Sequence, residues 1–135
     1  MIQFEIPGTP VGKGRPRFTK AGRTYTPAGT VHFENRAAFF AQIAMAGKPP
    51  LSGPVALDVW AYWPCPKSRH RKLEPRPEEP RTSYPDADNV LKAVADALNG
   101  IAYQDDRQVT DAQIHKITAA QGEPPRTVVS VRSAI

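Results

Sequence analysis

Cysteine, histidine and long apolar runs are scarce in this chain, and each scarcity excludes a class of protein. A single cysteine, Cys65, among 135 residues cannot form an internal disulfide or a cysteine metal site. The histidines His32, His70 and His115 lack metal-ligand spacing, so we expect them on the surface. No apolar run approaches the roughly 20 residues that span a bilayer, and the N-terminus lacks the pattern of a secretory signal. We therefore expect a cytoplasmic protein with no membrane partner.

Acidic residues are also in the minority. Lys and Arg number 18 against 13 Asp and Glu, which gives a net charge of +5. An excess of positive charge favours a polyanionic partner, most often nucleic acid. The glycines between Gly8 and Gly14 match neither the dinucleotide fingerprint nor the Walker pattern, so we expect no nucleotide cofactor.

Apolar periodicity and turn residues predict one α/β (α+β) domain over residues 1–135, because the length suits a single core. We expect a mixed β-sheet flanked by two main helices. The predicted order is a strand at 2–6, a loop or irregular hairpin at 7–29, a helix at 31–46 capped by Thr30 and ended by Gly47, a strand at 55–63, a polar proline-rich loop at 64–85, a helix capped by Asp88 or Asn89 and ending near Asn99, and strands at 108–118 and 126–133.

The candidate chemistry lies in two acidic motifs that flank the second predicted helix. If Asp86 and Asp88 lie in an extended segment, their side chains point to the same side. Two such carboxylates repel unless a cation sits between them, and oxygen-only ligands suit Mg²⁺ or Mn²⁺. Asp105 or Asp106, just past the helix, supplies a third carboxylate. The alternative is that both motifs only cap helices and form turns.

Lys92 extends this site, because it follows Asp88 by four residues and can lean back toward it from the next helical turn. An ordinary solvent lysine, or an ion pair with Asp88 or Asp96, is the alternative. Asp96 is expected to support Lys92 or another partner rather than bind metal. The chemistry indicated is phosphodiester hydrolysis, with metal-activated water and a lysine that stabilises the charge on the phosphate.

Two basic segments are candidate DNA contacts. The first interleaves its cations with Phe18 and Tyr25, a pattern that suits phosphate contact and stacking on an unpaired base. The second lies in the proline-rich loop. The alternative for both is a solvated loop. The candidate DNA-binding residues are Lys13, Arg15, Arg17, Lys20, Arg23, Arg69, Arg71, Lys72 and Arg76.

Four blocks carry a family resemblance: residues 6–17 (IPGTPVGKGRPR), 85–92 (PDADNVLK), 96–100 (DALNG) and 103–109 (YQDDRQV). Together they resemble the RusA family of Holliday junction resolvases (crossover junction endodeoxyribonucleases) of bacteria, phages and prophages. The resemblance implies a homodimer that nicks four-way DNA junctions in symmetric pairs, with Mg²⁺ or Mn²⁺, during recombination and repair.

The resemblance also implies roles for individual residues. The essential carboxylates of the family correspond to Asp86, Asp88 and Asp106, with Asp105 as the alternative third ligand, and its functional lysine corresponds to Lys92. We therefore predict a Mg²⁺-dependent endodeoxyribonuclease. A nuclease acting on flaps or forks and a non-catalytic DNA-binding module are the alternatives. A metal-dependent glycosyltransferase is disfavoured because the chain is too short for the usual fold.

Overall fold

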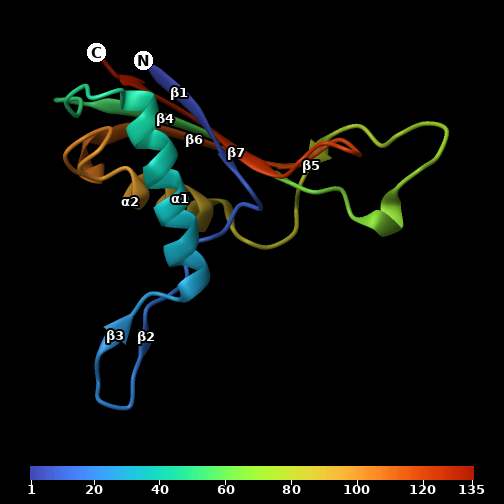
Figure 1. The fold of residues 1–135 in the computed structure, drawn as a ribbon, viewed down its shortest axis with the longest axis horizontal. Helices are drawn as coiled ribbons and strands as arrows, with labels where there is room; N and C mark the ends of the chain where they lie inside the picture. Colours follow the sequence, from blue (N-terminus) through green and yellow to red (C-terminus); the bar gives the residue numbers. More distant parts are fainter.

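A five-stranded mixed sheet forms the centre of the molecule (Figure 1). The computed structural model describes residues 1–135. The sheet order is β1-β7-β4-β6-β5, with β4 and β6 parallel and the other neighbours antiparallel. The strands are β1 (Ile2–Pro7), β4 (Val55–Trp63), β5 (Glu79–Pro80), β6 (Val109–Thr118) and β7 (Arg126–Ser133). The predicted mixed sheet is confirmed, and the short strand β5 within the proline-rich loop was not predicted.

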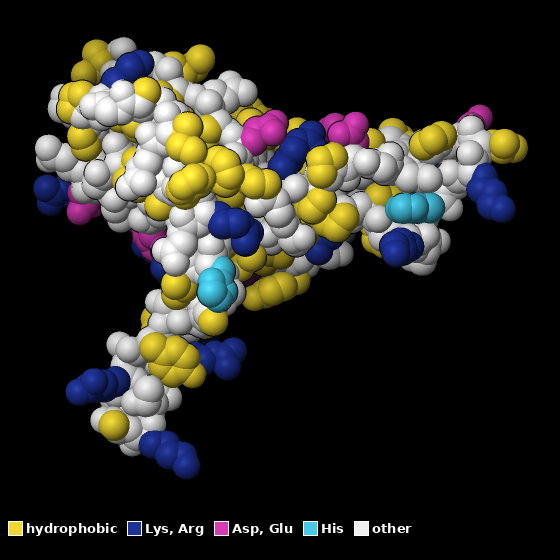
Figure 2. All heavy atoms as spheres, viewed as in Figure 1, with side chains coloured by type: hydrophobic (Ala, Val, Ile, Leu, Met, Phe, Trp, Pro, Cys, Tyr) yellow, Lys and Arg dark blue, Asp and Glu magenta, His cyan; other side chains and the backbone are white.

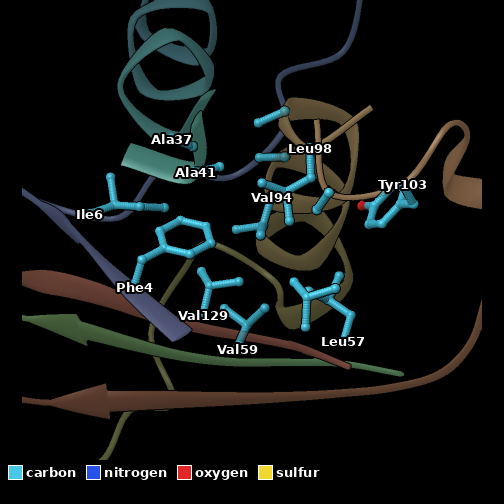
Figure 3. Packing of buried hydrophobic residues seen from close by; sticks show 14 of the residues in the cluster. Phe4, Ile6, Ala37, Ala41, Leu57, Val59, Val94, Leu98, Tyr103 and Val129 are labelled. Atoms are coloured by element: carbon cyan, nitrogen blue, oxygen red, sulfur yellow. The ribbon is translucent and has the colours of Figure 1, made fainter. Parts of the chain in front are cut away.

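Two helices, α1 (Ala28–Met45) and α2 (Ala87–Ala97), pack on each other and on one face of this sheet. Side chains alternate along β4: Val55, Leu57 and Val59 are buried in the core, while Trp60 on the opposite face is half-buried. Figure 3 shows the helix and strand side chains meeting in one apolar layer. The main core comprises Phe4, Ile6, Phe33, Ala37, Ala41, Met45, Val55, Leu57, Val59, Ala93, Val94, Ala97, Leu98, Ala102, Tyr103, Val129 and Val131.

Two segments project from this body (Figure 1). The strands β2 (Arg17–Phe18) and β3 (Thr24–Tyr25) form an antiparallel hairpin that extends past the start of α1, which confirms the irregular hairpin predicted there. The proline-rich loop extends in another direction and contains the short 3-10 helix η1 (Lys67–Arg69). Basic side chains are spread along both projections (Figure 2).

The start of α1 differs from the prediction. The helix begins at Ala28 rather than Val31, and Pro27 occupies the N-cap position. Thr30 is therefore inside the first turn, and its hydroxyl serves the preceding loop: it accepts from the Gly14 N–H at 3.0 Å and donates to the Gly12 carbonyl at 3.4 Å. From sequence alone, a threonine that bonds to a neighbouring loop cannot be distinguished from one that caps a helix. Thr30 was therefore wrongly predicted to be the cap. The helix ends at Met45, one residue before the predicted end, and Ala46 is its left-handed C-cap with a φ of 50°; Gly47, predicted to end the helix, follows with a φ of 80°.

The start of α2 also differs. Asp86 is the N-cap residue, without a side-chain cap bond, and Asp88 already lies in the first helical turn. The amides of Asn89 and Val90 donate to the Asp86 carbonyl at 3.1 and 3.2 Å, so the helix starts two residues early. The prediction that Asp86 and Asp88 share one extended segment was wrong, as was the capping role given to Asp88 or Asn89.

Neither helix has the length and apolar character required to cross a bilayer.

Candidate active site

One side of α2 carries a row of charged residues at four-residue spacing: Asp88, Lys92 and Asp96. Such spacing places side chains on one face of a helix. The Lys92 Nζ donates to Asp96 Oδ1 at 3.0 Å and lies 3.7 Å from Asp106 Oδ2. Lys92 is 57% exposed whereas Asp96 is 18% exposed. The ammonium group therefore sits between two carboxylates at the surface.

Tyr103 brings the second acidic motif back to α2. Its ring is fully buried in the core beside Leu98 (Figure 3). Its hydroxyl donates to the Ala95 carbonyl of α2 at 2.7 Å, and its own carbonyl accepts from the Gly100 amide at 2.7 Å. Burial raises the pKa of Tyr103, so the hydroxyl remains a donor at neutral pH. The return of the chain beside α2 is thus fixed three residues before Asp106.

Gln108 fixes the other end of this turn. Its Oε1 accepts from the backbone amides of Gln104 and Asp105 at 2.9 and 3.1 Å. Its Nε2 donates to the carbonyls of Leu51 and Gly53, both at 2.9 Å. One side chain therefore ties the acidic turn to the segment that precedes β4. Sequence reasoning missed Gln108, because a polar residue in a turn carries no signal of four backbone contacts.

Asp105 and Asp106 occupy different environments. Asp105 caps the 3-10 helix η2 (Asp106–Gln108), and its Oδ1 accepts from the Arg107 amide at 2.9 Å. That backbone bond lowers the pKa of the Asp105 carboxyl. Asp106 instead faces Lys92 and Asp96. The capping interaction gives Asp105 a structural partner that Asp106 lacks.

The carboxyls of Asp96 and Asp106 interact, and their pKa values shift in opposite directions. A hydrogen bond with the Asp96 carboxyl raises the pKa of Asp106, and partial burial adds to that rise. Burial alone would also raise the pKa of Asp96, but hydrogen bonds with Lys92, Asp106 and Lys13 outweigh it and lower that pKa. The surroundings of Asp106 thus disfavour its ionised form. A cation bound nearby would stabilise that form.

Lys13 lies within this network rather than on the exposed basic surface. Its Nζ is 2.6 Å from Glu34 Oε1 and 3.2 Å from Asp96 Oδ2, and the side chain is 23% exposed. Burial would lower the pKa of Lys13, but hydrogen bonds with Glu34 and Asp96 outweigh that effect and raise it. The spacing of basic residues could not separate Lys13 from its neighbours, because its two partners lie on α1 and α2.

Asp86 and Asp88 remain exposed at the start of α2 and form no ion pair. No three or more His, Cys, Asp or Glu side chains are close enough together to hold a metal ion. The structure therefore brings Lys92, Asp96 and Asp106 together but does not bring Asp86 and Asp88 to them. The donor chemistry along this face is oxygen-only, which fits Mg²⁺ or Mn²⁺ rather than a softer metal.

The other predicted DNA contacts divide into free and engaged groups. Those of the hairpin are exposed, together with Phe18 and Tyr25, at 75% and 47%. In the proline-rich loop, Arg69 pairs with Glu79 at 2.8 Å, and Arg76 Nε donates to the Arg69 carbonyl at 3.0 Å. Among the predicted DNA contacts, the exposed cations without an ion pair are Arg15, Arg17, Lys20, Arg23, Arg71 and Lys72.

The histidines and the cysteine are outside this site. His115 stacks on Trp60 across the sheet face away from the helices, with ring centroids 5.6 Å apart. The His70 ring contacts the Cys65 carbonyl, and His32 is exposed on α1. The predicted surface positions of the three histidines are confirmed.

A family model described as "Endodeoxyribonuclease RusA" matches residues 7–132. This chain belongs to the RusA endodeoxyribonuclease family. It is also 36% identical over 141 residues to "Uncharacterized protein YqaN" of Bacillus subtilis (strain 168), a match that covers 97% of this chain and 95% of that protein. The predicted family is therefore confirmed. RusA membership supports endonuclease activity and implies a branched DNA substrate.

Proposed function

We propose that this protein is a Mg²⁺- or Mn²⁺-dependent endodeoxyribonuclease that resolves four-way DNA junctions in recombination and repair. The observation that supports it most is the meeting of Lys92 with Asp96 and Asp106 on the exposed edge of α2, in a chain of the RusA family. A surface lysine held between carboxylates, in a protein of net charge +5, suits a reaction on a phosphodiester.

Asp86, Asp88 and Asp106 are the proposed metal ligands. A bound divalent ion would lower the pKa of a water molecule and neutralise charge on the phosphate oxygens. Asp106 is preferred over Asp105 because the Asp105 side chain is already engaged as a helix cap. If all three carboxylates bind one metal ion, Asp86 and Asp88 at the start of α2 must approach Asp106, which lies beyond the end of that helix.

Lys92 is proposed to hold the scissile phosphate. Its ammonium carries three N–H donors; one is used by Asp96, and the neighbouring Asp106 is 3.7 Å away. An exposed, oriented cation stabilises the negative charge that develops on the phosphate without transferring a proton. Asp96 orients Lys92 by fixing its Nζ from the next turn of the same helix.

The projecting hairpin is proposed to bind the DNA backbone. Residues 6–33 contain no Asp or Glu, so the exposed Arg15, Arg17, Lys20 and Arg23 are not neutralised locally. The exposed Phe18 among them suits stacking on an unpaired base near a branch point. Arg71 and Lys72 on the second projection, with Arg69 and Arg76, are the proposed second contact with the backbone.

We further propose a homodimer, because paired nicks in a four-way junction require two equivalent active sites, and a two-fold dimer provides them. The family resemblance supports this assignment. Sedimentation equilibrium is expected to give twice the monomer mass at micromolar concentration, and a monomer mass there would contradict it.

The proposal is tested by comparing labelled four-way junctions, flaps, forks and linear duplex as substrates with Mg²⁺. We expect preferential nicking of the four-way junction, at symmetric positions in opposing strands. Preferential cutting of flaps or forks would identify a nuclease for other branched DNA. Binding of junctions without cutting in either Mg²⁺ or Mn²⁺ would indicate a non-catalytic DNA-binding module.

A further inference from the structure

Lys13 joins the two helices at the proposed active site. It contacts Glu34 of α1 and Asp96 of α2, whereas the neighbouring cations of the same loop and hairpin are exposed and unpaired. We infer that Lys13 is a positioning residue of the nuclease, which holds Asp96 so that Asp96 in turn orients Lys92. This inference rests on the proposed function of Lys92.

The two oxygens of Asp96 have separate partners. Oδ2 lies 3.2 Å from the Lys13 Nζ, and Oδ1 lies 3.0 Å from the Lys92 Nζ. The contact of Lys13 with Oδ2 fixes the rotation of the Asp96 carboxylate, and Lys92 approaches it through Oδ1. Its remaining N–H donors stay directed to the side where Asp106 lies, 3.7 Å away. Without Lys13, the Asp96 carboxylate is free to rotate and bind Lys92 through both oxygens, which draws the ammonium away from the phosphate.

The backbone around Lys13 is built for close approach. The Lys13 amide donates to the Asn89 carbonyl in the first turn of α2 at 2.8 Å. A Cβ on Gly12 would lie 2.8 Å from the Pro85 Cβ, and one on Gly14 would lie 2.7 Å from the Pro27 Cγ. Side chains at either position would force this segment away from both helix starts. The Gly-Lys-Gly sequence therefore places Lys13 in the gap between α1 and α2.

The charges around Lys13 also support a positioning role rather than a DNA contact. Glu34, Asp96 and Asp106 are three carboxyls that share only Lys13 and Lys92 as ion-pair partners. Removal of Lys13 leaves Lys92 to neutralise the cluster alone. A lysine that contacted DNA would instead need its ammonium group free of carboxylates, as that of Lys20 is.

The experiment separates turnover from binding in Lys13→Met. The single-turnover nicking rate is measured at saturating enzyme with Mg²⁺, and the Kd for an uncut junction is measured in EDTA over a range of salt. We expect the rate to fall roughly 10–100-fold, as for other residues that orient a catalytic group through a hydrogen bond. We expect Kd and its salt dependence to remain as in the wild type.

Three variants serve as controls. Lys20→Met should raise Kd and lower the slope of log Kd against log salt by about one, the signature of a lost phosphate contact. Lys48→Met removes the same charge from an exposed position after α1 and should change neither quantity. Lys13→Arg retains the cation and should recover most of the rate.

The nicking rate of a double variant of Lys13 and Asp96 provides a second test. Because Lys13 acts through Asp96, Lys13→Met with Asp96→Asn should be no slower than Asp96→Asn alone. If Lys13→Met impairs folding, Lys13→Gln replaces it as a polar side chain that is shorter and carries no ammonium group, and the same loss of rate is expected.

Three outcomes overturn the inference. A Lys13→Met protein that behaves like Lys20→Met, with weaker binding and an intact saturating rate, would make Lys13 a DNA contact. A lowered Tm with an unchanged rate would make it only a tie between helices. Additive losses in the double variant would show that Lys13 does not act through Asp96. A wild-type protein that cuts no DNA would instead contradict the proposed function itself.

Discussion

At the scale of single residues, Asp106 is expected to destabilise the metal-free protein when it ionises. Its pKa is raised in the folded state by the Asp96 carboxyl and by burial. When the pKa of a carboxyl is higher in the folded than in the unfolded protein, its ionisation destabilises the folded state. The free energy of unfolding therefore falls as pH rises past the pKa of the unfolded state, about 3.9. Asp106→Asn should therefore raise Tm in EDTA by a few degrees at pH 7 while abolishing nicking.

The same measurement at lower pH checks the cause. The gain in Tm for Asp106→Asn should shrink toward pH 4, because the wild-type carboxyl is then increasingly protonated. Thermal unfolding followed by circular dichroism gives both values. An equal or lower Tm at pH 7 would show that ionised Asp106 is stabilised by Lys92 more than it is opposed by Asp96.

Asp96, its neighbour, is expected to behave in the opposite way. Burial alone would raise its pKa, but its hydrogen bonds, with Lys92 first, outweigh burial and lower it. A depressed folded pKa contributes stability that is present above the unfolded value and lost as pH falls through the folded value, below about pH 4. Asp96→Asn should lower Tm at pH 7, and the difference from wild type should narrow in acid. A constant difference at every pH would assign the loss to packing instead.

At the scale of elements, the acidic turn depends on Gln108. Its four backbone contacts hold residues 104–105 against residues 51–53. Gln108→Ala leaves these groups without their partner and should lower the free energy of unfolding by about 1–3 kcal/mol. Urea denaturation measures this loss, and hydrogen exchange at residues 104–108 should accelerate. Gln113→Ala, at an exposed position on β6, is the matched control and should change neither.

Elements with a buried apolar face could be predicted from the sequence. The alternation in β4 and the stripe of Val90, Val94 and Leu98 in α2 reflect burial, which residue type reports directly. Helix starts could not be predicted, because Thr30 bonds to a loop and Asp86 begins α2 through its backbone carbonyl. The strand β5 was not predicted because two residues are too few to show the alternating pattern of a strand.

At the scale of the whole molecule, positive charge is concentrated on a projecting hairpin that stands apart from the carboxylates (Figure 2). Each phosphate contact releases counterions on binding. Replacing Arg17 and Lys20 together by Ala should therefore weaken junction binding and lower the slope of log Kd against log salt by about two. Fluorescence anisotropy in EDTA measures the slope, and an unchanged slope would exclude the hairpin as a DNA contact.

The site as a whole was only partly accessible to sequence reasoning. Residue type and spacing indicated oxygen ligands near Lys92, and the pairing of Lys92 with Asp96 was among the alternatives. Asp86 and Asp88 do not share the extended backbone predicted for them, because Asp88 lies in the first turn of α2. Lys13 was predicted only as a DNA contact, and Tyr103 and Gln108 were not predicted as site residues, because their contacts cross the fold and no local pattern encodes them.

The carboxylates at the two ends of α2 are proposed to support metal-dependent cutting of a DNA junction. The most direct test is cleavage of a four-way junction, labelled on each strand in turn, by wild-type protein and Asp88→Asn, with Mg²⁺, Mn²⁺ or EDTA. We predict paired symmetric nicks by the wild type with a divalent metal and none in EDTA, and unimpaired junction binding without cutting by Asp88→Asn. Cutting by Asp88→Asn at the wild-type rate, or none by the wild type in Mg²⁺ or Mn²⁺, would contradict the account.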